Sequence, residues 1–278
     1  MKPERIYVAV DFKSSYLGVV SYAIWFAKTF NCKNICLFHI MEYTLTPPSY
    51  LMPYINQEKN KIEKKLISLA EELKKYEINT ENKVVFGRLI ESIKEVIKDE
   101  KAFAVIGFKT HITRPSTSER ILKGLTIPVL IVKVKDFQAI NPESIKIKKI
   151  LCPVDFSSYS LRALTTAKEI SDKLHAELKV IHVIPEEKVK GIIEEPLEIE
   201  KYLLYLKEEA IEKLQKLDKD IQYEVISGIP SEEILKKAED VDLIIIGSKG
   251  RSYTEAVIIG SVAESVIKNS KIPVLLIP

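Results

Sequence analysis

The sequence contains little of what marks secreted, metal-binding or membrane proteins. Its three cysteines, Cys32, Cys36 and Cys152, form no C-x-x-C pair and none lies at metal-ligand spacing from a histidine, which argues against a disulfide scaffold or a zinc site. No apolar run approaches the roughly 18 residues of a membrane span, and the chain start leads directly into a strand pattern without a signal-peptide core. We therefore expect reduced, buried thiols, a cytoplasmic location and no membrane partner.

Excess charge and histidine are scarce as well. The formal net charge is +3, from 42 basic and 39 acidic residues, and no Lys/Arg block stands free of acidic neighbours, so we expect no nucleic-acid partner. Of the four histidines, His111 and His175 are isolated, which leaves no cluster for a metal. His39 and His182 end apolar runs, where a histidine is usually a hydrogen-bonded core residue.

The 278 residues exceed the usual size of one hydrophobic core, and the chain repeats itself. Motifs of the first half recur in the same order about 140 to 145 residues later. Val10-Asp11-Phe12 returns as Val154-Asp155-Phe156, and Ile127-Pro128-Val129-Leu130 returns as Ile272-Pro273-Val274-Leu275. We expect two copies of one domain, at residues 1–135 and 148–278, joined by a linker at 136–147 where Asn141-Pro142 interrupts the apolar pattern.

Each copy alternates short apolar runs with longer amphipathic ones. In the second copy the runs typical of strands are Ile150–Val154, Leu178–Ile184, Tyr223–Ile226, Leu243–Ile246 and Val274–Ile277. The runs typical of helices are Leu161–Leu174, Leu197–Leu217, Ser231–Ala238 and Ser261–Lys268. Strands that are apolar on both faces and alternate with helices predict an α/β fold, a doubly wound and mainly parallel sheet with helices on both faces.

Three of the chain's nine glycines form one motif in the second copy. From Gly247, at the end of the fourth expected strand, the spacing is G-x2-G-x9-G-S, which closes at Gly260-Ser261 where a helix begins. Glycines let backbone N–H groups approach an anion, and a helix start adds unpaired N–H donors. The motif predicts a phosphate cradle, to which Arg251 adds a cation. A purely structural alternative stays open, because Ser261 and Glu264 also fit a helix capping box.

The order of these motifs resembles the ATP-binding branch of the universal stress protein family. The resemblance rests on Pro153-Val154-Asp155, on Val183, on the glycine motif and on Ile272-Pro273-Val274, and it covers both copies nearly end to end. It implies a five-stranded sheet of order 3-2-1-4-5 in each copy. It further implies that ATP, alone or with Mg²⁺, lies across the ends of the first and fourth strands.

The same resemblance assigns roles to individual residues. Asp155 holds the adenine or ribose side and Val183 contacts the base, while the glycine loop and the following helix start meet the phosphates. The residues implied to bind the nucleotide are Pro153, Val154, Asp155, Val183, Ile246, Gly247, Gly250, Arg251, Gly260, Ser261 and Val262.

The first copy departs from the motif at its centre. Its loop is about five residues shorter, Thr110 stands in place of Gly250, and Pro115 stands in place of Gly260. Proline has no N–H to offer a phosphate. We therefore expect nucleotide in the second copy only, although Asp11 remains in the first. The segment from Tyr43 to Tyr54, rich in proline and aromatic residues, has three open interpretations: a cover for the degenerate site, a partner contact, or an ordered surface loop.

No positioned base or nucleophile accompanies the expected binding site, since Ser261 has no histidine partner and Asp155 is its only carboxylate. The sequence thus favours a non-catalytic, nucleotide-binding regulator. The resemblance implies a role in stress response, with the two copies paired in the chain or between chains, and a protein partner that the sequence does not identify. Two alternatives remain: a slow ATP-hydrolysing or nucleotidyl-transferring enzyme, and an interaction module that binds no nucleotide.

Overall fold

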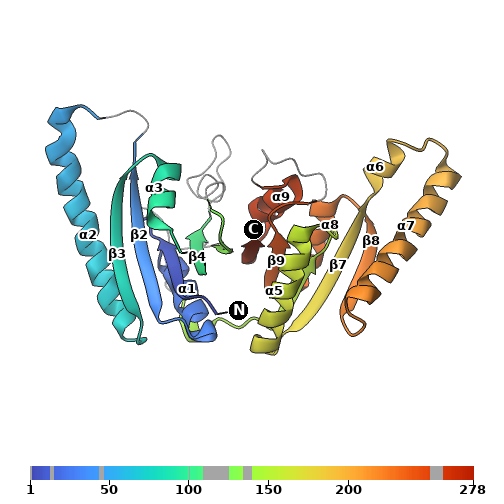
Figure 1. The fold of residues 1–278 in the computed structure, drawn as a ribbon, viewed down its shortest axis with the longest axis horizontal. Helices are drawn as coiled ribbons and strands as arrows, with labels where there is room; N and C mark the ends of the chain where they lie inside the picture. The colour runs from blue at the N-terminus through green and yellow to red at the C-terminus, as the bar shows by residue number, and fades with distance from the viewer. Residues whose placement is uncertain are drawn as a thin grey trace. The chain divides into compact units, whose positions relative to one another are not determined.

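The computed structural model describes residues 2–12, 16–43, 47–99, 101–108, 125–133, 140–250 and 259–278. The chain divides into two compact units, Met1–Ile145 and Lys146–Pro278. In each unit strands alternate with helices, as the sequence repeat predicts (Figure 1). Residues 136–139 of the expected linker lie outside the described residues.

The second unit has a parallel sheet with helices on both faces. Its described strands are β6 (Lys149–Pro153), β7 (Glu177–Pro185), β8 (Gln222–Gly228), β9 (Leu243–Gly247) and β10 (Val274–Ile277). Its described helices are α5 (Ser158–Leu174), α6 (Glu186–Lys190), α7 (Pro196–Leu217), α8 (Pro230–Lys237) and α9 (Ser261–Asn269). The strand order is β8-β7-β6-β9-β10 and each pairing is parallel, so the expected order 3-2-1-4-5 is confirmed. The short helix α6 was not predicted.

The order of the strands decides which helix covers which face. The chain winds outward from β6 through β7 to β8, then returns to β9 and winds the other way to β10. Right-handed crossovers therefore place α5 on one face, and α8 and α9, which contact each other, on the opposite face. The carboxyl ends of β6 and β9, where the winding reverses, are the usual binding edge of such a sheet.

The first unit repeats this architecture. Its described strands are β1 (Arg5–Ala9), β2 (Asn34–Glu42), β3 (Asn79–Gly87), β4 (Ala102–Gly107) and β5 (Val129–Val132). Its described helices are α1 (Tyr16–Phe30), α2 (Met52–Lys74) and α3 (Leu89–Val96), with short 3-10 turns at Ser49–Leu51 and Pro142–Ser144. The order is β3-β2-β1-β4-β5, again with parallel pairings.

The cysteines are reduced and buried, as expected. Cys32, Cys36 and Cys152 form no disulfide, and burial raises the pKa of Cys36 and of Cys152 to about 12. These two thiols stay protonated at neutral pH and behave as small apolar core residues. Within the part of the chain that the structure describes, no helix is both long and apolar enough to cross a bilayer.

Glu224 of β8 connects three elements of the second unit. Its carboxylate pairs with Lys179 of β7, at 2.9 Å, and with Lys237 of α8. The hydrogen bond from Lys237, followed by that from Lys179, lowers the pKa of Glu224 below its ordinary value of 4.5. A carboxylate with a lowered folded-state pKa contributes stability above its unfolded pKa, and this contribution is lost as the pH falls through the folded-state value.

We predict that Glu224→Gln lowers the free energy of unfolding by about 1 kcal/mol at neutral pH. The difference from wild type should shrink toward zero near pH 3, because protonation of Glu224 then removes the same interaction. Urea unfolding followed by circular dichroism at several pH values measures it. Glu239→Gln is the control, since Glu239 and Lys271 are highly exposed and 4.0 Å apart. A pH-independent difference would contradict the assignment.

Candidate functional site

The two ends of the glycine motif meet at the carboxyl edge of the second sheet. A Cβ atom added to Gly260 would lie 3.5 Å from Lys249 Cα and 3.6 Å from the backbone nitrogen of Gly250. Residues 248–250, which follow β9, thus lie against the residue that precedes α9. Residues 251–258 between them, including Arg251, lie outside the described residues.

Because they have no side chain, Gly250 and Gly247 each let another group lie close to the backbone, and this group differs between them. A Cβ at position 250 would lie 2.6 Å from Asp155 Oδ2, so the glycine lets the loop backbone rest on that carboxylate. A Cβ at position 247 would lie 2.7 Å from the carbonyl carbon of Tyr159 and 2.8 Å from the nitrogen of Ser160. Gly247 therefore lets the first turn of α5 pack on the end of β9, which is a structural role.

Asp155 is fixed in the turn that joins β6 to α5. Its Oδ1 accepts hydrogen bonds from the backbone N–H of Ser157, at 3.0 Å, and from Ser157 Oγ, at 2.6 Å. This is an Asx turn, in which an aspartate bonds to the backbone two residues ahead. Ser157 in turn caps α5 by accepting from the N–H of Ser160. One carboxylate oxygen thus shapes the turn, and the other faces Gly250.

The helix α9 begins without the capping box that the sequence allowed. Ser261 is its first helical residue, the N-cap is Gly260, and no side chain caps the helix. Glu264 instead pairs with Lys268, at 2.8 Å. The capping interpretation is wrong because the chain enters the helix one residue earlier than a serine cap requires. The exposed Ser261 is therefore not explained by capping.

The backbone shows how the glycines of the motif act. The N–H of Gly260 donates to the carbonyl of Ser248, at 2.8 Å, so this amide closes the loop. Gly260 has a φ of −71°, and among the described glycines only Gly228 has a φ in the left-handed region. The motif needs its glycines for the absence of a side chain. It does not need them for left-handed backbone angles.

Several of the predicted site residues are core residues. Pro153, Val154 and Ile246 are buried. The backbone N–H of Val154 donates to the carbonyl of Ile181, at 2.8 Å, so that amide is already used. These three residues position the edge of the sheet. Val183, half-buried at the end of β7, and Val262, half-buried in the first turn of α9, lie nearer to the surface.

A cluster around Phe156 was only partly anticipated. His182 Nδ1 donates to the carbonyl of Val154, at 2.6 Å, and its ring packs on Phe156 with centroids 4.8 Å apart. Phe156 has a left-handed φ of 63°, and Lys213 of α7 places its Nζ 5.7 Å from the ring centroid. The expectation of a hydrogen-bonded core histidine is confirmed. The Asp-Phe pair occurs in both halves of the sequence, and this repetition could have drawn attention to Phe156.

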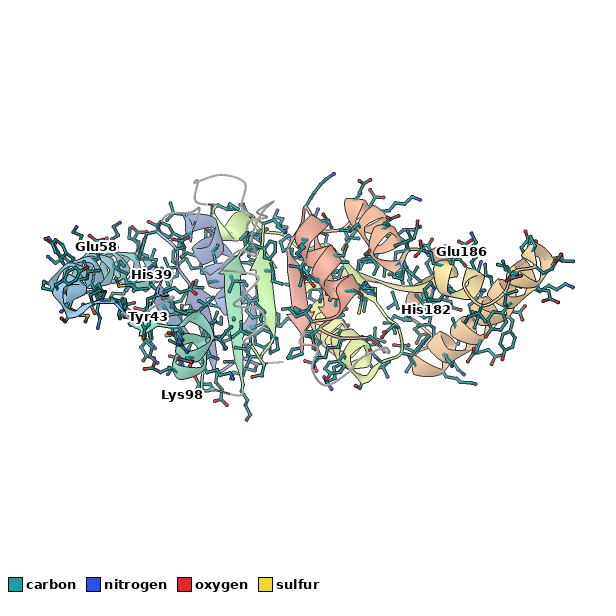
Figure 2. All side chains as sticks on the ribbon, turned by 90° about the horizontal axis from the view of Figure 1, so that it is seen from above. His39, Tyr43, Glu58, Lys98, His182 and Glu186 are labelled. Carbon is teal, nitrogen blue, oxygen red and sulfur yellow. The ribbon has the colours of Figure 1, made fainter. Side chains whose placement is uncertain are left out.

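The first unit contains the matching cluster. His39 Nδ1 donates to the carbonyl of Val10, at 2.6 Å, and Lys65 Nζ lies 5.3 Å from the centroid of Phe12. Figure 2 labels His39 and His182 on their corresponding strands, β2 and β7. Because both units keep this arrangement, it belongs to the scaffold.

Lys249 is a cation in the glycine loop that sequence reasoning passed over. Its Nζ lies 5.4 Å from the centroid of the Tyr159 ring, and its carbonyl lies 3.4 Å from Ser157 Oγ. Arg162 stacks on the same tyrosine, 4.5 Å from the centroid. The position of Lys249 between Gly247 and Gly250 could have pointed to it in the sequence. Its side chain places a positive charge beside the loop.

The first unit differs at the corresponding edge. Asp11 is exposed, whereas Asp155 is half-buried. Thr110 and Pro115, on which the expected closure of the first site depends, lie outside the described residues, as does His111.

In the segment from Tyr43 to Tyr54, Tyr43, labelled in Figure 2, packs on Phe86 with ring centroids 4.8 Å apart. Tyr50 and Tyr54 are exposed. His175 of the second unit ends α5 in a left-handed conformation.

The described residues contain no group of three His, Cys, Asp or Glu side chains that could hold a metal ion. In the described part of the site Asp155 is the only carboxylate at the glycine loop, and its Oδ1 already accepts two hydrogen bonds. Protein ligands alone therefore offer little to a divalent cation here.

A model of the universal stress protein family matches residues 3–133 and again residues 146–278. The chain belongs to this family. Two universal stress proteins of Methanocaldococcus jannaschii are similar to it: one is 36% identical over 156 residues, covering 48% of this chain and 96% of the relative, and the other is 38% identical over 141 residues, covering 47% and 81%. Each relative thus corresponds to about half of this chain.

A solved structure supports the tandem arrangement at the level of the fold. A universal stress protein from Archaeoglobus fulgidus superimposes with a TM-score of 0.70 at 24% identity, covering 100% of this chain and 99% of that one. Two consecutive family domains in one chain are therefore the architecture of this universal stress protein.

We predict that Gly247→Ala lowers the free energy of unfolding by about 1–3 kcal/mol, because the methyl group must displace the backbone of α5. Gly260→Ala should change it by less than about 1 kcal/mol, since its Cβ meets only ordinary contacts and its φ suits alanine. Urea unfolding of both variants measures the difference. Equal losses for the two would show that Gly247 has no special packing role.

Proposed function

We propose that the second unit binds an adenine nucleotide, ATP, and acts as a non-catalytic regulator in the stress response. The observation that carries the proposal is the convergence of three features at one edge. These are the side-chain-free backbone at Gly250, the carboxylate of Asp155 that faces it, and the start of α9 next to Gly250.

The start of α9 suits a phosphate. The N–H of Glu264 is the first to make an α-helical bond, to the carbonyl of Gly260. The amides of Ser261, Val262 and Ala263 therefore have no acceptor within the helix, and the helix dipole adds partial positive charge. Phosphates bind at such helix starts. The exposed hydroxyl of Ser261 adds a donor at the same place.

The remaining residues divide between the two ends of the nucleotide. On the phosphate side, Lys249 and Arg251 supply cations to the loop, beside Gly247 and Gly250. On the other side, Asp155 orients the ribose or base, and Val183 packs against the base. Pro153, Val154 and Ile246 hold the sheet edge in place. Mg²⁺, where it takes part, is held chiefly by the phosphates, because the described protein groups offer it one carboxylate.

We propose regulation in preference to catalysis because the described site has no base beside a nucleophile. Nucleotide occupancy would then bias the surface around the loop and α9 toward a protein partner or a second chain in the cytoplasm. Slow ATP hydrolysis or nucleotidyl transfer is the second candidate, since it needs only a bound ATP and a water. The nucleotide recovered from purified protein separates them: intact ATP supports the regulator, and ADP or AMP supports turnover.

We predict one ATP site per chain by isothermal titration calorimetry. Gly260→Val should weaken ATP binding by about 100-fold, because a branched side chain at the helix start keeps the phosphates away from the amides. The backbone angles of Gly260 are open to valine, so the fold should persist. Circular dichroism and urea unfolding verify this.

Gly191→Val, in the turn after α6 and outside the glycine motif, is the matched control and should bind ATP like wild type. Two sites per chain would contradict the proposal that the first unit is empty. If the wild-type protein bound no adenine nucleotide at all, the chain would be an interaction module.

A further inference from the structure

The helix α7 has two apolar faces. Its inner face packs on β7 and β8 through buried residues such as Ala210 and Leu214. Its outer face exposes large apolar side chains in its first half: Leu197 at 58%, Tyr202 at 44%, Leu204 at 58% and Tyr205 at 57%. Tyr202 and Tyr205 are stacked, with ring centroids 6.1 Å apart. We call these four residues the α7 patch.

The first unit provides an internal comparison. The corresponding helix α2 also follows the second strand of its sheet and packs on β2 and β3. On α2 the exposed large apolar side chains are Met52 and Tyr54, in its first turn, and Ile67, whereas the other exposed positions from Asn56 to Lys74 are polar or charged. The fold therefore does not require an apolar outer face on this helix. The α7 patch is a property of the second unit, and contiguous exposed apolar surface of this kind marks interaction sites.

The charges beside the patch are of opposite sign and lie on opposite sides of it. Lys201 lies one turn before the pair Leu204 and Tyr205, and Glu208 lies one turn after it. Both are exposed, and neither has an ion-pair partner among the described residues. Further along the helix, by contrast, Glu209 pairs with Lys213 and Glu212 with Lys216.

This order of charges selects one kind of partner. Suppose that a second α7 packs antiparallel on the first, with the two-fold axis of the pair between Leu204 and Tyr205. Lys201 of each copy then faces Glu208 of the other. Leu204 then faces Tyr205 of the second copy. A parallel pair would instead place Lys201 against Lys201 and Glu208 against Glu208. Such an isologous contact is the commonest form of homodimer interface.

We propose that the α7 patch is a homodimer interface in which the α7 helices of two chains pack antiparallel. The patch alone provides less than the roughly 800 Å² that each partner buries in a standard interface. The dimer should therefore be weak and depend on concentration, which suits a contact that forms and dissolves.

Sedimentation equilibrium of the full chain over a range of concentrations tests the association. Leu204→Glu should weaken it by at least about tenfold, because it places a charge in the apolar centre of the contact. Ile67→Glu, the same change on the outer face of α2, should leave it unchanged. A wild-type chain that stays monomeric, or a dimer that tolerates Leu204→Glu, would overturn the proposal.

Charge reversal tests the antiparallel direction. Lys201→Glu and Glu208→Lys should each weaken the dimer, since each creates two like-charge contacts. The double variant should restore it, because the opposite charges again face each other. Failure of the double variant to recover would exclude this pairing.

Cross-linking tests the register, since the native cysteines are buried. Leu204→Cys lies next to the two-fold axis and should form a disulfide-linked dimer on mild oxidation. Leu197→Cys should not, because the two copies of residue 197 would be about 22 Å apart along the helices, beyond the roughly 7 Å that a disulfide spans. Efficient cross-linking at both positions would indicate parallel helices.

Discussion

The close approach between the chain segments that follow β6 and β9 is the constraint on which the rest of the second unit's carboxyl edge depends. Position 247 accommodates the backbone of α5, and position 250 accommodates the carboxylate of Asp155, each at a distance that no side chain would permit. Because Asp155 is held by Ser157, it cannot move aside without losing two hydrogen bonds. The glycine loop is thereby fixed to the turn that starts α5, and the start of α9 is fixed to the loop through the Gly260 amide.

Most of the fold could be predicted from the sequence because it depends on patterns that are periodic or repeated. Apolar runs such as Leu243–Ile246 are buried on both faces, and the structure places them in the centre of a parallel sheet. The recurrence of Val-Asp-Phe and Ile-Pro-Val-Leu reveals two domains without any knowledge of contacts. The helix α6, at Glu186–Lys190, was missed because five residues are too few to show helical periodicity.

The sequence alone could locate the candidate site, but it could not give the role of each residue in it. Spacing identified the glycines, yet it could not separate Gly247, which packs against a helix, from Gly250, which rests on a carboxylate. The serine at 261 fitted a capping box by type, and only the backbone shows that the cap is Gly260. The position of Lys249 between two glycines was visible in the sequence, but its contact with the ring of Tyr159 was not. The role of each of these residues depends on tertiary contacts. Such contacts join residues that are far apart in the sequence, so the sequence alone does not show them.

The two units show which features serve the scaffold and which serve the site. The histidine that bonds to the carbonyl of the preceding strand end, and the lysine over the neighbouring phenylalanine, occur in both. A feature retained in both units cannot explain a difference between them.

Two features differ between the units. The aspartate after the first strand is exposed at Asp11 and half-buried at Asp155, and the outer face of the helix after the second strand differs in its exposed apolar residues. The half-buried aspartate and the apolar patch on α7 both belong to the second unit, so the proposed nucleotide site and the patch occur on one domain. Lys213 of α7 lies over Phe156, next to Asp155, and the exposed Tyr205 belongs to the same helix, about two turns earlier. A shift of α7 would therefore alter both surfaces, which would connect the proposed nucleotide site and the proposed dimer contact through one helix.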